Sequence, residues 1–171
     1  MKKHKRLAGS AAASLRKLVA QNEYQRFDMI DGTHPWQEAM EEQVVLYPVR
    51  ELGRGNVTYF NYRLAKEMGL ISLDHPHKMN KDLEKTLLKT FSIQIINEYE
   101  QENKIQYDPA IVKKNMYMAT RYLQLQHDSR SGKTSGDGRS IWNGFVQNQG
   151  KAWDVSSRGT GVTKLAPGAV K

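Results

Sequence analysis

The sequence predicts an α+β fold in which helices come first and a β-hairpin follows toward the C-terminal end. Apolar residues recur every three to four positions over much of the first 125 residues, which is typical of amphipathic helices. After residue 129 the sequence changes to glycine, serine and short β-branched or aromatic runs, which are typical of turns and strands. Helices that precede strands, rather than alternate with them, favour α+β over a parallel α/β arrangement.

The composition is that of a globular chain. Its 171 residues are enough for one domain with a hydrophobic core, and 39% of them are hydrophobic. The absence of cysteine excludes disulfides and thiolate metal sites, and it favours a reducing compartment, which we expect to be the cytoplasm. No apolar run approaches the length needed to cross a bilayer, so we expect no membrane partner.

The net charge of +8 indicates an anionic partner, such as a nucleotide, nucleic acid or an acidic protein. The basic excess lies toward the two ends of the sequence. Residues 1–22 hold six Lys or Arg and no acid, and residues 129–171 hold seven Lys or Arg and two Asp. We interpret residues 1–22 as a basic helical arm, although a mitochondrial presequence has a similar composition.

Two helices are expected before residue 50. The first covers residues 8–22 and has an apolar face. The second covers residues 35–45, in which Trp36, Met40 and Val44 recur at a spacing of four.

Residues 56–60 are β-branched or aromatic and predict a short extended segment. Asn61 is then a suitable N-cap for the helix that follows. Gly69 fits the left-handed position after the end of that helix, with Leu70 folding back toward Ala65.

Two longer helices are predicted in the middle of the chain. The first runs from residue 81 to 102 with Asn80 as its cap, because apolar residues recur at a spacing of four: Leu83, Leu87, Phe91, Ile95 and Tyr99. The second opens at Asp108-Pro109 and runs to Leu125, with Ile111, Met116 and Tyr122 as buried residues.

Two glycine-rich turns with adjacent strands form the predicted hairpin. The first turn, residues 136–139, enters the apolar run Ile141-Trp142 and its strand ends at Asn143-Gly144; the second follows the run 151–155. Glycines let backbone amides approach a phosphate closely, and a neighbouring arginine adds a planar charged fork. The two turns therefore indicate a nucleotide triphosphate pocket on a small sheet, and two ordinary hairpin turns are the alternative.

The stretches GDGRSIWNG and WDVSSRGTGVT resemble the selenoprotein O family, whose pattern is roughly GDGRAxxLGE, a spacer, and WELQLKGAGxTP. Upstream, NYRLAKEMGL at residues 61–70 is similar to the N-x-x-L-A-x-x-L-G-L helix near that family's N-terminus. The ordered match covers roughly residues 56–168 and is thin between about 75 and 130. The resemblance implies a protein-kinase-like fold that transfers AMP from ATP, with Mg²⁺ or Mn²⁺, to protein hydroxyls.

The same resemblance assigns nucleotide-binding roles to six residues: Gly136, Gly138, Arg139, Arg158, Gly159 and Gly161. Arg158 stands where the family has a lysine that grips the ATP phosphates and pairs with a helix glutamate. Arginine keeps the charge but is not interchangeable with lysine, which puts catalysis in doubt more than phosphate binding. The family's second Gly-Asp-Gly has no clean counterpart. Its general base and metal ligands would lie beyond Lys171, so no catalytic or metal-binding residue is assigned.

We therefore divide the chain into a basic arm (1–22), a mainly helical region (23–128) and a truncated nucleotide-binding β-unit (129–171) that resembles part of a kinase-like N-lobe. The chain is expected to be the N-terminal part of such an enzyme, binding nucleotide weakly and catalysing nothing alone. One alternative is a small basic nucleic-acid-binding protein that uses residues 129–139 and the N-terminal arm. Another is an inert fragment or paralogue. The pair His75 and His77 is interpreted as a turn before a helix rather than a metal site.

Overall fold

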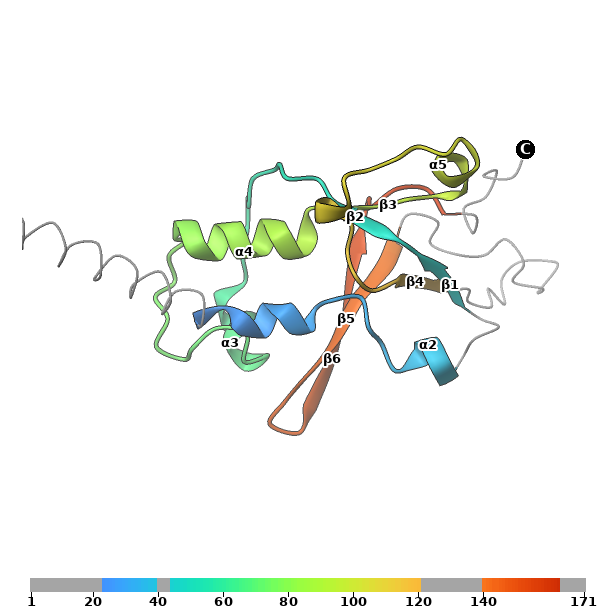
Figure 1. Cartoon of the computed structure of the whole chain (residues 1–171). Helices are drawn as coiled ribbons and strands as arrows, with labels where there is room; N and C mark the ends of the chain where they lie inside the picture. The colour runs from blue at the N-terminus through green and yellow to red at the C-terminus, as the bar shows by residue number, and fades with distance from the viewer. Residues whose placement is uncertain (1–22, 40–43, 121–139, 164–171) are drawn as a thin grey trace, which may run out of the picture.

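The described part of the chain contains two antiparallel sheets (Figure 1). The computed structural model describes residues 23–39, 44–120 and 140–163. The larger sheet has the order β1 (Val44–Tyr47), β4 (Tyr117–Thr120), β5 (Ser140–Asn148) and β6 (Lys151–Arg158), and the smaller one pairs β2 (Val49–Glu51) with β3 (Ile93–Ile95). The predicted α+β class is confirmed, but four of the six strands come before residue 121 and lie among the helices.

The helices are short: η1 (Gln25–Met29), α2 (Trp36–Ala39), α3 (Tyr62–Glu67), α4 (Lys81–Phe91), α5 (Glu98–Glu102) and η3 (Pro109–Ile111). Figure 1 shows η1, α3 and α4 on one side of the β5–β6 hairpin and α2 on the other. A first core cluster joins η1, α3 and α4 to the inward face of the hairpin through buried Phe27, Leu83 and Val146. A second cluster, which includes Tyr47, Ile95 and Ile141, joins the two sheets.

Local capping signals are confirmed where they were predicted. Asn61 Oδ1 accepts the backbone N–H of Leu64 at 3.0 Å and begins α3. Gly69 has a φ of +69°, and the N–H of Leu70 returns to the carbonyl of Ala65 at 2.8 Å. This is the left-handed ending that the sequence predicted.

The predicted helix over residues 81–102 begins correctly and ends too late. Asn80 Oδ1 accepts the N–H of Leu83 at 2.8 Å, but α4 stops at Phe91. The β-branched residues that follow pair as β3 with β2, with Ile95 opposite Val49. The pairing of β3 with β2 therefore prevents the helix that the apolar spacing of four predicted over these residues. A separate helix, α5, begins after β3.

The predicted helix over residues 108–125 is wrong. Asp108 does cap a turn, accepting the N–H of Ala110 at 2.9 Å, but that turn is only the 3-10 helix η3. The chain then continues into β4, where Tyr117 and Met118 are buried. Of the residues expected in the core, Ile111 is half-buried and Met116 is exposed, while Tyr122 lies outside the described residues.

One further boundary differs from expectation. Of the helix predicted over residues 35–45 the structure describes α2, whereas Val44 and Val45 belong to β1 and pair with β4. Residues 56–60, expected as a short extended segment, pair with no described strand. The helix predicted at residues 8–22 lies outside the part of the chain that the structure describes, within which no helix is long and apolar enough to cross a membrane.

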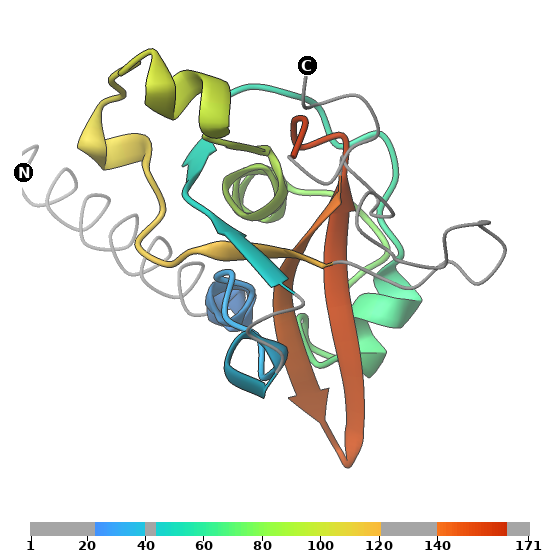
Figure 2. The ribbon, with the colours of Figure 1, turned by 90° about the vertical axis from the view of Figure 1, so that its right-hand side faces the viewer.

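The β5–β6 hairpin is longer than predicted. It turns at Gln149-Gly150, with φ values of 49° and 77°, as a two-residue turn with positive φ at both positions requires. Figure 2 shows this turn projecting beyond the rest of the sheet. β5 does not end at Asn143-Gly144, which instead forms an irregularity in the pairing. Gly144 is packed against the chain at Ile30, since a Cβ there would lie 3.0 Å from the Ile30 Cα.

Candidate functional site

The antiparallel hairpin brings the ends of the two glycine-rich motifs together. Ser140, the first described residue after the first motif, lies directly opposite Arg158, the last residue of β6. Gly136, Gly138 and Arg139 themselves lie outside the described residues. Among the described residues, the strand that follows the first motif and the strand that precedes the second are therefore neighbours that meet at one end of the sheet.

Gly159 and Gly161 have different environments. Both have positive φ, +79° and +114°, which favours glycine at each position. A Cβ on Gly159 would meet no atom within 4 Å, whereas one on Gly161 would lie 2.9 Å from the Ile95 Cγ1. The backbone of Gly159 is thus open to a ligand, while glycine at position 161 is required by packing against β3.

The loop after β6 is fixed to the smaller sheet. The carbonyl of Thr160 accepts the N–H of Ile95 at 2.9 Å, on the edge of β3 that faces away from β2. Thr160 and Thr163 are both buried, and Asn97 Nδ2 lies 3.4 Å from the carbonyl of Val162. A loop held in this way loses little conformational entropy when it binds a ligand.

The side chains of β6 alternate between the two faces of the sheet. Asp154, Ser156 and Arg158 are exposed, whereas Trp153 and Val155 are half-buried against the first core cluster. Arg158 therefore lies on the face of the sheet that is opposite to the helices η1, α3 and α4. The sequence did not predict which face of the sheet carries Arg158.

The exposed face carries an aromatic cluster around a buried histidine. The rings of Trp36, Trp142 and Phe145 surround His34 at centroid distances of 5.0 to 5.5 Å. The N–H of Trp36 donates to His34 Nδ1 at 3.1 Å, so Nε2 carries the ring proton and donates to Asp154 Oδ1 at 2.8 Å. No local pattern identified this contact, because His34 and Asp154 are far apart in the sequence.

The histidines at 75 and 77 make contacts with neighbouring residues of the chain. His75 Nδ1 donates to the carbonyl of Pro76 at 2.7 Å and its Nε2 accepts from the hydroxyl of Tyr24 at 2.8 Å, while His77 stacks on Tyr62. Among the described residues no group of three or more His, Asp or Glu side chains could hold a metal ion. The prediction of a turn before α4 is confirmed.

The described part of the chain does not carry the net positive charge. Residues 23–39, 44–120 and 140–163 hold 14 Lys or Arg and 14 Asp or Glu. The remaining 12 basic and 4 acidic side chains, and with them the net charge of +8, belong to the other residues. A uniformly basic surface for nucleic acid is therefore absent from the described residues.

No family model, curated protein or solved structure matches this chain.

Proposed function

We propose that the chain is the N-terminal part of a protein adenylyltransferase similar to the selenoprotein O family. In this proposal residues 136–161 contribute part of an ATP site. One observation carries it, which is the pairing of Ser140 with Arg158. Because of this pairing, the two motifs that resemble the family's nucleotide-binding stretches adjoin at one end of a hairpin.

The described residues at this end suit a polyphosphate. Arg158 is exposed at the strand end, and its guanidinium presents a fork of N–H donors to phosphate oxygens. Gly159 leaves its backbone open on a loop that is fixed to β3 through Thr160. Arg139, which directly precedes Ser140 in the sequence, is proposed as the second phosphate-binding arginine.

The proposed division of labour follows from the side chains. Bound ATP, with Mg²⁺ or Mn²⁺, would supply the activated AMP group for transfer to a protein hydroxyl. Arg158 would bind and orient phosphate, and it would not take up the hydroxyl proton because a guanidinium stays protonated in proteins. A general base and metal ligands, as the resemblance implies them, are proposed to belong to a part of the protein beyond Lys171.

An NMR titration with ATP and Mg²⁺ tests the proposal. We expect shifts at the amides of Ser140 and Gly159 and an affinity no tighter than about millimolar, roughly 4 kcal/mol. Arg158→Ala should remove the binding and Arg158→Lys should keep it, while Arg63→Ala, an exposed arginine on α3, serves as the matched control. Shifts confined to other parts of the sheet, or equal losses in the Arg158→Ala and Arg63→Ala variants, would reject the site.

A further inference from the structure

The strand β6 forms an open edge of the larger sheet. It pairs with β5 along one side, and no other described segment pairs with it along the opposite side. Proteins commonly protect such edges with charged side chains, proline, a bulge or a very short strand. β6 is eight residues long, contains no proline, and the extra residue of the irregular pairing lies in β5 rather than in β6. Its charged residues are Arg158 at its end and Lys151 and Asp154, which are paired with Glu67 and His34.

The inward face of the sheet is less covered at β6 than at β5. Ile141 and Val146 of β5 are 1% and 0% exposed. Trp153 and Val155 of β6 pack against the first core cluster, as Val146 does, but remain half-buried. The core therefore lacks covering atoms along the β6 edge, within the parts of the molecule that the structure describes.

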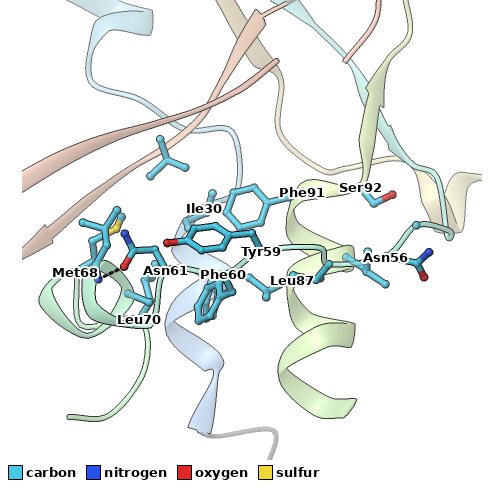
Figure 3. Close-up of a pocket in the computed structure, with 17 residues that line it drawn as sticks. Ile30, Asn56, Tyr59, Phe60, Asn61, Met68, Leu70, Leu87, Phe91 and Ser92 are labelled. Carbon is cyan, nitrogen blue, oxygen red and sulfur yellow. Dashed lines mark hydrogen bonds between the residues drawn. The ribbon is translucent and has the colours of Figure 1, made fainter. Parts of the chain in front are cut away.

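An apolar cavity of about 580 Å³ lies beside this edge (Figure 3). Val155 borders it from β6, and Leu64 of α3 and Phe91 of α4 border it from the helices. Tyr59 and Leu64, which also line it, are 80% and 40% exposed. Figure 3 shows the rings of Tyr59, Phe60 and Phe91 gathered around the cavity.

The wall of the cavity formed by residues 55–60 also offers backbone groups. None of the N–H groups from Gly55 to Phe60 is bonded to the backbone of another described residue. The cavity thus borders β6 on one side and, on another, a peptide segment whose N–H groups make no backbone hydrogen bond to the described residues. An extended peptide matches both borders, because it supplies main-chain donors and acceptors and sends alternate side chains to one side.

The positive charges near the cavity favour a peptide with acidic residues at its ends. Arg54 directly precedes the segment 55–60 and Arg63 follows it on α3; both are exposed, and no described carboxylate lies within ion-pair distance of either. Lys151 of β6 is already paired with Glu67 at 2.6 Å. A second copy of this chain would bring the same two arginines, Arg54 and Arg63, to these basic surroundings, so a peptide with acidic ends is the better occupant.

We propose that the β6 edge and the adjoining cavity bind an extended peptide with alternating apolar side chains and acidic ends. The peptide would add a fifth strand to the larger sheet and place its apolar side chains against Val155, Leu64 and Phe91. This role is separate from nucleotide binding, since it uses the side of β6 rather than its end.

Fluorescence anisotropy with a labelled peptide tests this inference without nucleotide. The probe alternates valine with threonine and carries glutamate at both ends. We expect it to bind, and we expect its N-methylated form, which lacks alternate backbone donors, and its lysine-ended form each to bind at least about tenfold more weakly. Equal binding of the N-methylated form, or no binding of the probe, would overturn the proposal.

Substitutions in the protein provide a second test of peptide binding. Leu64→Glu and Tyr59→Glu should each weaken binding at least about tenfold, and the high exposure of Tyr59 ensures that its variant folds. Leu73→Glu is the matched control, because Leu73 is 78% exposed and does not line the cavity. An equal loss in the control would overturn the proposal. So would a concentration-dependent dimer that Leu64→Glu abolishes, which would assign the edge to a second copy.

Discussion

His34 Nε2 donates a hydrogen bond to Asp154 Oδ1 at 2.8 Å across 120 residues of sequence. Asp154 stands inside the WDVSSRGTG stretch that was interpreted as part of a nucleotide site. Its side chain instead fixes the segment around His34 to the outer face of the hairpin. The contact therefore positions the strand that leads to Arg158, without touching the glycine-rich loop itself.

Removal of the Asp154 carboxylate should destabilise the protein. The His34 side chain is 1% exposed, so Asp154→Ala leaves its Nε2–H buried without an acceptor, at a cost of about 1–3 kcal/mol. Asp154→Asn keeps a carbonyl acceptor and should cost clearly less. Urea unfolding measures both, with Glu102→Ala, an exposed acid on α5, as the control. Equal losses for Asp154→Ala and Asp154→Asn would show that the hydrogen bond is not the cause.

Tyr24 connects two polar groups beneath α4. Its hydroxyl donates to His75 Nε2 and accepts from Asn80 Nδ2, each at 2.8 Å. Tyr24→Phe leaves both groups without this partner and should lower the free energy of unfolding by about 1–3 kcal/mol. Tyr59→Phe, at an 80% exposed tyrosine, should change it by less than about 0.5 kcal/mol. A similar loss in both variants would contradict this role of the Tyr24 hydroxyl.

Ionisation of Tyr117 should weaken the fold at high pH. Burial, with a smaller effect from the charges of Asp31 and Glu51, raises the pKa of Tyr117 to about 12, compared with about 10 for an unfolded chain. The folded state therefore holds this proton longer than the unfolded state. Its contribution is fully present below pH of about 10 and is lost as the pH rises toward about 12.

The measurement is urea unfolding between about pH 9 and 12 for the parent and Tyr117→Phe. The parent should lose up to about 2–3 kcal/mol more than the variant over this range. The variant corrects for the other tyrosines, of which Tyr24 also has a raised pKa because of burial. Phenolate absorbance from Tyr117 that develops near pH 10 in the folded protein would contradict the prediction.

The starts of α3 and α4 could be predicted from the sequence, because the residues that cap a helix lie next to it in the chain. Asn61 and Asn80 lie within three residues of the amides that they cap, and both caps are confirmed. Helix ends were missed where a distant strand competes. Ile95 continues the apolar spacing of α4, yet it pairs with Val49 in the smaller sheet. The residues near Ile95 in the sequence do not indicate this partner.

The same division holds at the candidate site. The turn-and-strand character of the two motifs could be inferred locally, and the hairpin that joins them is present from Ser140 to Arg158. Two other contacts could not be inferred from the sequence: the close packing of Gly161 on Ile95 and the hydrogen bond between His34 and Asp154. Each joins segments that are far apart in the chain. A glycine that a motif assigns to a ligand can thus be required by packing alone.

Alanine substitutions at the two glycines separate packing from ligand binding. Gly161→Ala places a Cβ 2.9 Å from the Ile95 Cγ1 at a φ of +114°, so strain and overpacking should together cost about 2–5 kcal/mol. Gly159→Ala meets no neighbour and should cost only the left-handed penalty of about 1–2 kcal/mol. In an ATP titration of folded protein, however, Gly159→Ala should show the larger loss of binding, since its backbone faces open space. If Gly159→Ala leaves ATP binding unchanged while Arg158→Ala abolishes it, the loop backbone takes no part in holding phosphate.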